Sequence, residues 1–120
     1  KYNSPRQDEA EDVIRHADLT MDVKKHECLL GGRPVALTPT EFSILQILLE
    51  NRGNVVSGEE LFHKIWKDEY YVKSNNTITV HIRRLREKLE LDPANPEYIR
   101  TKWGVGYYLS ARGPRRLENV

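Results

Sequence analysis

Residues 75–89 carry side chains whose types and spacing suit the reading of a base sequence. At about 100° per residue on a helix, Asn76, Val80 and Arg84 fall on one side. Arginine and asparagine can each form paired hydrogen bonds with base edges in the major groove of duplex DNA, and a small apolar side chain can contact a thymine methyl. This side of the segment therefore predicts a surface that contacts bases.

The other side of the same segment is aliphatic. Its apolar residues fall within roughly 40° of one another on the helical wheel, a narrow stripe typical of a helix that packs on a core. They are Ile78, Ile82, Leu85 and Leu89. A helix with this apolar side is suited to packing on the rest of the protein and presenting the arginines on its other side to an anion. The alternative is a surface helix whose arginines are simply solvated.

The overall charge hides an uneven distribution. The 120-residue chain has a formal net charge of +1. Residues 1–72 hold 9 Lys and Arg against 13 Asp and Glu, a net charge of −4, whereas residues 73–112 hold 8 against 4, a net charge of +4. The positive part contains the amphipathic segment, as binding to a polyanion requires.

Composition also restricts the setting of the protein. With 31% charged and 38% hydrophobic residues, the chain is typical of one globular domain. Cys28 is the single cysteine, so an intrachain disulfide is impossible and a reducing compartment is the simplest setting. No stretch approaches the roughly 18 apolar residues that cross a bilayer, and the N-terminus is too polar for a secretory signal. We expect a cytoplasmic protein without membrane contact.

The first third of the chain predicts a linker followed by a small antiparallel sheet. Residues 1–12 carry almost nothing to bury and are expected to be a linker from an upstream domain. Apolar and polar side chains then alternate in short runs over residues 13–37, with a glycine-pair turn at 31–32. The domain itself is expected at 13–110, followed by a polar tail at 111–120.

Two helix starts are marked by local sequence. Thr38 and Glu41 are spaced as a capping box, and Pro39 occupies the first helical position between them. Ser57 and Glu60 repeat the capping-box spacing before a second apolar run. Each signal predicts a helix that begins there.

A third helix and a hairpin complete the pattern. The helix is expected over residues 75–91, because the two prolines in 92–96 cannot continue its hydrogen-bond ladder. Residues 98–109 surround a glycine-rich turn and predict a β-hairpin that carries Arg100 and Lys102. Three helices followed by a hairpin describe a winged helix, a variant of the helix-turn-helix.

Motifs from all of these elements occur together in the order of a known family. They are Leu37-Thr38-Pro39-Thr40-Glu41-Phe42, Val55-Val56-Ser57, Leu61 with Ile65-Trp66, Val80 through Leu89, and Ile99-Arg100-Thr101 with Gly104-Val105-Gly106-Tyr107. Over about residues 17–110 the chain resembles the effector domain of OmpR/PhoB-type response regulators, transcription factors of bacterial two-component systems. The segments 74–81 and 103–107 are most similar to the regulators of vancomycin-resistance operons.

This resemblance implies an α+β fold: a winged helix-turn-helix with an N-terminal four-stranded antiparallel sheet, three helices and a C-terminal β-hairpin wing. It implies sequence-specific binding of double-stranded DNA at direct repeats, with helix 75–91 in the major groove and wing 98–109 at the adjacent minor groove. It also implies an upstream receiver domain, a sensor kinase and contact with RNA polymerase. The loop residues expected to face the polymerase are Asp68, Glu69, Tyr70 and Tyr71.

The same resemblance assigns roles to single side chains. The positions expected to read bases in the major groove are Asn76, Thr77, Val80 and Arg84. The positions expected to contact phosphates are Trp66, His81, Arg83, Arg86 and Tyr107. Three alternatives stay open. Asn76 can instead cap the helix or bind a phosphate, His81 can be a buried histidine, and Trp66 can be a core residue.

The tip of the wing departs from the family pattern. Some relatives place an arginine at the position of Trp103, where it enters the minor groove. This chain has tryptophan there, with Lys102 beside it and Arg100 on the same expected strand. We expect Trp103 to pack or stack instead.

No motif predicts catalysis, a cofactor or a metal. The Gly104-Val105-Gly106 segment lacks the third glycine of a dinucleotide loop. His26 and Cys28 lack a second ligand pair at zinc-site spacing, and no nucleophile has a base beside it. We therefore expect no enzyme activity.

Two other functions remain open on the sequence alone. The first is a winged-helix module that binds a protein through the same helix or through the loop at 67–73. The second is binding of single-stranded nucleic acid, with Trp66, Trp103 and Tyr107 as stacking platforms.

Overall fold

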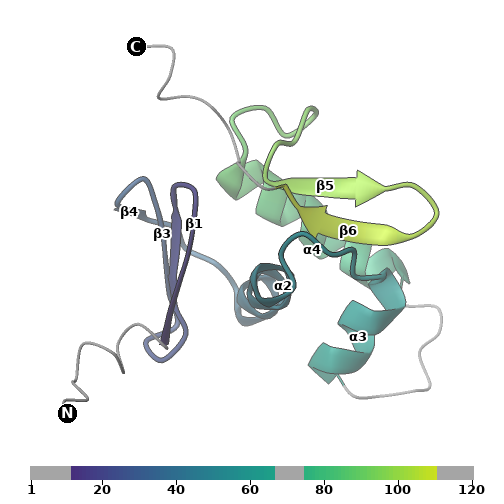
Figure 1. Ribbon diagram of the computed structural model, residues 1–120, viewed down its shortest axis with the longest axis horizontal. Coiled ribbons are helices and arrows are strands. Elements are labelled where there is room, and N and C mark those ends of the chain that lie inside the picture. Colours follow the sequence, from purple (N-terminus) through teal and green to yellow (C-terminus); the bar gives the residue numbers. More distant parts are fainter. Residues whose placement is uncertain (1–11, 67–74, 111–120) are drawn as a thin grey trace.

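The computed structural model describes residues 12–66 and 75–110, with side chains from residue 77 onward in the second range. Its architecture is α+β, with a four-stranded sheet, three helices and a two-stranded hairpin in chain order (Figure 1). The predicted fold class is thereby confirmed. The expected polar tail, all but the last residue of the expected linker, and the loop residues Asp68, Glu69, Tyr70 and Tyr71 lie outside the described residues.

Four short strands form an antiparallel meander in the order β1-β2-β3-β4. They are β1 (Val13–His16), β2 (Leu19–Asp22), β3 (Glu27–Leu30) and β4 (Arg33–Pro34). Alternation along the strands turns Leu19, Met21 and Cys28 into the core, where each is at most 3% exposed. Figure 1 shows this sheet at one end of the molecule, beside the first helix.

Helix α2 (Pro39–Glu50) begins with the predicted capping box. The Glu41 backbone N–H donates to Thr38 Oγ1 at 3.2 Å, and the Thr38 backbone N–H donates to Glu41 Oε1 at 3.0 Å. The two bonds satisfy donors that a helix start leaves unpaired. The buried side of α2 then supplies the centre of the core through Phe42, Ile44, Leu45, Leu48 and Leu49.

Helices α3 (Gly58–Trp66) and α4 (Asn75–Leu89) pack against α2 and against each other (Figure 1). The Glu60 backbone N–H donates to Ser57 Oγ at 3.0 Å, which caps α3 as predicted. Helix α4 ends two residues before the predicted end at 91. Pro93 disfavours a helical backbone at the residue before it and cannot donate to the ladder, so the last turn closes early.

The C-terminal hairpin consists of β5 (Ile99–Lys102) and β6 (Gly106–Leu109), as predicted. Its second strand also pairs with Val56, which exchanges two backbone hydrogen bonds of 2.8 and 2.9 Å with Tyr107. A Cβ added at Gly106 would lie 2.2 Å from the Val56 carbonyl oxygen. Only glycine at position 106, which has no Cβ, allows the hairpin backbone to approach Val56 this closely.

None of the helices in residues 12–66 and 75–110 is long and apolar enough to cross a membrane. Over the same two ranges, no cluster of three or more His, Cys, Asp and Glu side chains is arranged to hold a metal ion. Burial raises the pKa of the Cys28 thiol to about 11. This thiol therefore stays protonated at neutral pH and is a core side chain.

Candidate nucleic-acid interface

Helix α4 has one buried and one exposed side, as its sequence predicts. Ile78, Ile82, Leu85 and Leu89 are each at most 1% exposed and pack into the core. The opposite side is open to solvent and comprises Thr79, Val80, Arg83, Arg84 and Glu87. The amphipathic stripe therefore fixes which side of the helix a ligand can reach.

Arg84 and Val80 lie in the middle of this exposed side. Val80 is 38% exposed, which is high for a branched aliphatic side chain, and Arg84 is exposed one turn later. Thr77 is half-buried, and the side chain of Asn76 lies outside the described residues. The structure thus brings the central two predicted base-reading residues together on an accessible surface.

Lys88 is a partly exposed cation of α4 whose ammonium group is engaged by α2 and the segment before it. Its Nζ donates to Glu41 Oε1 at 2.6 Å and to the Ala36 carbonyl oxygen at 2.8 Å. The Glu41 side chain is only 1% exposed, whereas that of Lys88 is 34% exposed. The ion pair therefore joins the end of α4 to the start of α2 at a buried site.

The ionisation of Glu41 follows from these contacts. Burial alone would raise its pKa, because it penalises the carboxylate. The hydrogen bonds from Lys88 and from the Thr38 backbone, with the charges of Lys88 and His81, lower the pKa below its ordinary value instead. Glu41 is thus a charged, buried anchor for α4 at neutral pH.

Arg86 was predicted to contact phosphate, but the structure gives its guanidinium an internal role. Its Nε and Nη2 both donate to the Ile99 carbonyl oxygen, at 3.1 and 2.9 Å, and Nη2 also donates to Thr101 Oγ1 at 2.8 Å. The guanidinium carbon lies 6.0 Å from the centre of the Tyr107 ring. Arg86 therefore fastens β5 to α4 and lies near the Tyr107 ring of β6, and its predicted phosphate contact stays a prediction.

Tyr107 stands where the hairpin meets two other elements. Its backbone pairs with Val56, and its hydroxyl lies 3.5 Å from Thr79 Oγ1 on α4. The side chain is half-buried. Tyr107, for which a phosphate contact is predicted, therefore also positions the hairpin against Val56 and α4.

Trp66 and His81 form a half-exposed aromatic corner between α3 and α4. The ring centres are 6.3 Å apart, and Trp66 also packs on Phe62 at 4.7 Å. Trp66 keeps 38% of its surface exposed, so core packing and an outward contact are both open to it. The Nδ1 atom of His81 is buried without a hydrogen-bond partner among the described residues. His81 is thus neither fully buried nor satisfied at this atom, contrary to the alternative of a satisfied core histidine.

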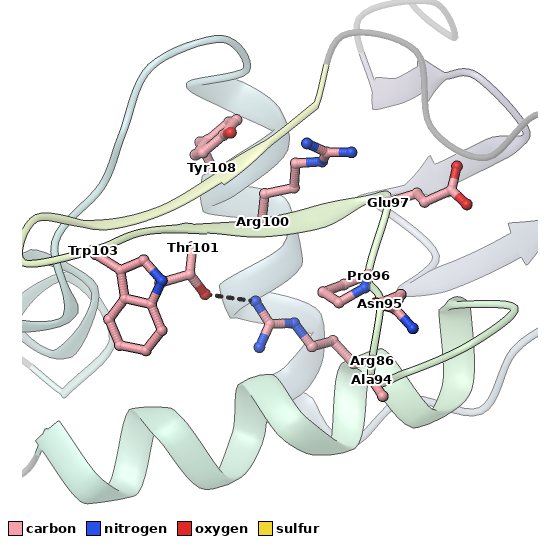
Figure 2. Close-up of a pocket in the computed structure, with 9 residues that line it drawn as sticks. All are labelled: Arg86, Ala94, Asn95, Pro96, Glu97, Arg100, Thr101, Trp103 and Tyr108. Atoms are coloured by element: carbon pink, nitrogen blue, oxygen red, sulfur yellow. Dashed lines mark hydrogen bonds between the residues drawn. The ribbon is translucent and has the colours of Figure 1, made fainter.

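The hairpin, the segment 94–97 and Arg86 of α4 line an open slot of about 620 Å³. Figure 2 shows Arg86 reaching from α4 to Thr101 on β5, within a slot that Arg100 and Trp103 also line. Arg100, Lys102 and Trp103 are exposed, and Trp103 is 90% exposed. The wing therefore presents two cations and an indole next to the exposed side of α4.

Glu90 is a structural residue that the sequence did not identify. Its carboxylate is 8% exposed and accepts backbone N–H bonds from Glu97, Tyr98 and Ile99, at 2.7 to 3.1 Å. It thereby fixes where the chain leaves α4 and enters the hairpin. A glutamate between Leu89 and Leu91 was the available signal, but its partners lie seven to nine residues away.

Comparison with known proteins matches the part of the chain that contains the three helices and the hairpin. The family model described as "Transcriptional regulatory protein, C terminal" matches residues 32–109. Over 97 residues the chain is 64% identical to the regulatory protein VanR of Enterococcus faecium, covering 81% of this chain and 42% of that protein. It is 43% identical over 109 residues to VanRc of Enterococcus gallinarum, covering 91% of this chain and 47% of that protein. The chain thus spans less than half the length of these relatives.

Solved structures show the same architecture. The response regulator DrrB of Thermotoga maritima, an OmpR/PhoB homologue, matches with a TM-score of 0.75 at 36% identity, covering 88% of this chain and 48% of that one. The RstA DNA-binding domain of Klebsiella pneumoniae, solved in complex with the RstA box, matches with a TM-score of 0.76 at 28% identity. This second match covers 83% of the present chain and 98% of that domain.

Proposed function

The chain belongs to the family of C-terminal domains of transcriptional regulatory proteins, of the OmpR/PhoB type, and we propose that it reads double-stranded DNA by placing α4 in the major groove. It is a DNA-binding effector domain of the response-regulator kind. One observation carries the proposal: Arg84 and Val80 are exposed at the centre of a helix whose opposite stripe is fully buried. Docking of that stripe leaves the arginine-bearing side free to enter a groove.

The chemistry of the exposed side favours base contacts at its centre. The guanidinium of Arg84 can donate two parallel hydrogen bonds to guanine O6 and N7, and the methyls of Val80 fit against a thymine methyl. Thr77 and Asn76 lie one turn earlier on α4, where they extend the reading toward the helix start. Together these four residues form the proposed base-reading set.

Contacts to phosphates would surround this set and fix its register. Arg83 is exposed on α4, and His81 and Trp66 form the aromatic corner on the side of α3. Tyr107, Arg100 and Lys102 approach from the wing. Arg86 contributes chiefly by holding the wing in place, since its Nε and Nη2 are engaged inside the protein.

The wider protein is also a matter of proposal, because the relatives are more than twice as long as the matched part. We propose an upstream receiver domain that is phosphorylated by a sensor kinase in the cytoplasm. Paired domains would then bind direct DNA repeats and contact RNA polymerase, with Asp68, Glu69, Tyr70 and Tyr71 as the expected polymerase-facing residues. The 64% identity to VanR supports a place among vancomycin-resistance regulators. The proposed role is binding rather than catalysis.

The experiment begins with selection of binding sites from random duplexes. Affinity of the domain for the selected duplex and for a scrambled one is then measured at several salt concentrations. Replacing Arg84 with alanine is expected to cost about 1–3 kcal/mol on the selected duplex and to relax the preference at one base pair. The scrambled duplex should be bound almost as before. Lys25→Ala, in the turn between β2 and β3, is the control for removal of one positive charge.

Three outcomes would contradict the proposal. Equal losses of affinity by Arg84→Ala on both duplexes would remove its base-reading role. Binding to duplex that does not weaken with salt would exclude phosphate neutralisation and favour the protein-docking module. Stronger binding to single strands than to duplex would favour the stacking function. Recovered sites in tandem at about 10–11 bp would support direct repeats, and inverted sites would contradict them.

A further inference from the structure

One carboxylate lies on the exposed side of α4, between two arginines. With Val80 as zero on the helical wheel, Arg84 lies at about 40° and Arg83 at about −60°. Glu87 lies at about −20°, between them and close to the line of Val80. It is exposed, as Arg83 and Arg84 are. Glu87 therefore extends the middle of the exposed side by two turns beyond Val80.

Two local effects make a glutamate unfavourable at this position. Glu87 lies in the last turn of α4, where the partial negative charge of the helix end opposes a carboxylate. Arg83 precedes it by four residues, and a helical pair is weaker when the cation lies nearer the helix start. Among the side chains that the structure describes, no Lys, Arg or His forms an ion pair with Glu87. The described fold thus gives no reason for a carboxylate here.

A carboxylate on a DNA-binding surface also restricts which bases it can face. A carboxylate only accepts hydrogen bonds, and the surrounding phosphates repel it. In the major groove, the donors on the base edges are the N4 amino group of cytosine and the N6 amino group of adenine. Guanine and thymine present acceptors there, and adenine places its N7 acceptor beside the amino group. Cytosine is therefore the base whose edge matches a carboxylate best.

We propose that Glu87 is a specificity-determining residue that accepts a hydrogen bond from the N4 amino group of a cytosine, in the base pair next to the one that Arg84 reads. This proposal rests on the function proposed above. Arg84 and Glu87 are three residues apart, which is about 4.5 Å along the helix axis. Neighbouring base pairs are about 3.4 Å apart along the duplex. The two side chains are thus spaced to reach adjacent base pairs.

Glu87 acts by exclusion as well as by recognition. Phosphates attract Arg83 and Arg84 on every duplex, whatever its sequence. The carboxylate opposes this attraction everywhere and is compensated only where a cytosine amino group faces it. A guanine or thymine at the same place sets an acceptor against the carboxylate and leaves both without a donor. Discrimination therefore combines one gained hydrogen bond with one repulsive contact.

The test repeats the selection from random duplexes with wild type, Glu87→Ala and Glu87→Gln. The wild type should select cytosine beside the base pair whose preference Arg84→Ala relaxes, and it should lose roughly tenfold in affinity when thymine or guanine replaces that cytosine. Glu87→Ala should lose the preference at this position alone. Glu87→Gln should shift the preference toward adenine, because an amide accepts from N6 and donates to N7. Glu27→Gln, on β3, is the control for removal of one exposed carboxylate.

The scrambled duplex gives a second measurement. Both Glu87 variants should bind it roughly threefold more tightly than the wild type at low salt, because one repulsive charge is gone. The difference should shrink as added salt screens the phosphates. The urea midpoint of both variants should be unchanged or slightly raised, since the carboxylate opposes the charge of the helix end. A change in binding is then separate from any change in folding.

Two results would overturn the proposal. One is an unchanged preference at every position of the selected site in both Glu87 variants. The other is a gain in affinity that is equal on the selected and scrambled duplexes, which would leave Glu87 with repulsion alone. If Arg84→Ala still relaxed the preference at its own base pair in either case, the proposed function would stand without base reading by Glu87. Absence of any base-pair effect in the variants of both residues would remove both proposals.

Discussion

Two pairs of cations on the same helix have different contacts. Arg83 and Arg84 are exposed. Arg86 is half-buried and Lys88 is partly exposed, and these two donate hydrogen bonds to the hairpin and to a buried carboxylate. On a helical wheel Arg86 and Lys88 flank the buried stripe at its two edges, and Arg83 and Arg84 lie between them on the far side. The difference teaches that a basic helix is not uniformly a ligand-binding surface.

The flanking cations set the rotation of the helix. An aliphatic stripe alone tolerates small rotations, because hydrophobic contacts are not directional. Arg86 makes three hydrogen bonds to the hairpin, and Lys88 makes two, to Glu41 and Ala36. These directional bonds on both edges fix where Arg83 and Arg84 point. DNA recognition by Arg83 and Arg84 (the outer cations) therefore depends on the hydrogen bonds by which Arg86 and Lys88 (the inner cations) hold the helix.

The largest effect is expected from removing the inner cation at Lys88. Lys88→Met leaves the Glu41 carboxylate, 1% exposed, without its ion-pair partner. A buried charge deprived of its partner typically costs about 3–5 kcal/mol, and we expect about 2–4 because Lys88 is partly solvated. Urea unfolding at pH 7 measures the change in stability.

Two further measurements test the cause. In the wild type the pKa of Glu41 is lowered, so the stability that it contributes is present above its ordinary pKa and is lost as pH falls below that value. In the variant, burial is still opposed by the Thr38 bond and the charge of His81 but no longer by Lys88, so it favours the protonated acid more strongly than in the wild type. The gap between the two proteins should therefore narrow as the pH falls from 7 toward 4. The double variant Glu41→Gln, Lys88→Met removes the charge, keeps a capping acceptor and should recover part of the stability. A constant gap, with no recovery, would contradict the ion-pair explanation.

A smaller effect is expected at Arg86. It distinguishes a residue that holds the hairpin in place from one that contacts DNA directly. Arg86→Ala removes three hydrogen bonds to Ile99 and Thr101. It should lower the free energy of unfolding by about 1–2 kcal/mol in total, near the value of a single bond to a charged group, because Arg86 is half-buried and water can replace part of these bonds. Hydrogen exchange of the β5 and β6 amides should accelerate. Affinity should fall by a similar factor on all duplexes, because a loosened wing weakens binding to phosphates, which every duplex presents alike.

Arg83→Ala is the matched variant on the exposed side of the helix. It should leave stability within about 0.5 kcal/mol of the wild type. It should reduce the steepness of the plot of log affinity against log salt by about 0.9, which is the contribution of one phosphate contact. If instead Arg83→Ala destabilised the fold and Arg86→Ala did not, the division between inner and outer cations would be wrong.

The sequence predicted the local parts of this arrangement. The capping box of Thr38 and Glu41 and the apolar stripe of α4 depend on spacing within a few residues, so both could be identified directly. The partner of Arg86 could not, because Ile99 and Thr101 approach it only when the hairpin folds back on α4. The same applies to Glu90, whose carboxylate accepts hydrogen bonds from the backbone N–H groups of residues 97–99, after the two prolines in 92–96. Residues that act through distant backbone carry no periodic signal.

His16 illustrates the same limit at the N-terminal sheet. It is 5% exposed, and its Nε2 lies 2.6 Å from the Ser110 carbonyl oxygen just after β6. Its Nδ1 lies 3.4 Å from Arg52 Nη1. The sheet and the end of the hairpin are therefore joined through a residue that no motif marked.

The smallest expected effect is a pH dependence from His16. Burial lowers its pKa, the bond to Ser110 raises it, and the charge of Arg52 lowers it further, with a net lowering from 6.5. The unfolded chain thus binds a proton more readily than the folded one at mildly acidic pH. The stability due to neutral His16 is present above about pH 6.5 and is lost as the pH falls through the lower folded pKa.

Unfolding by urea at pH 8, 6.5 and 5.5 tests this dependence, and the expected decrease is below about 1.4 kcal/mol for each unit by which the pKa is lowered. His16→Gln keeps polar atoms near Ser110 and Arg52 but does not titrate, so its stability should change less over the same range. Comparison at pH 8 gives the packing cost of the substitution alone. A wild type and a His16→Gln variant whose stabilities fall in parallel would assign the acid sensitivity to other groups and leave His16 only its bond between sheet and hairpin.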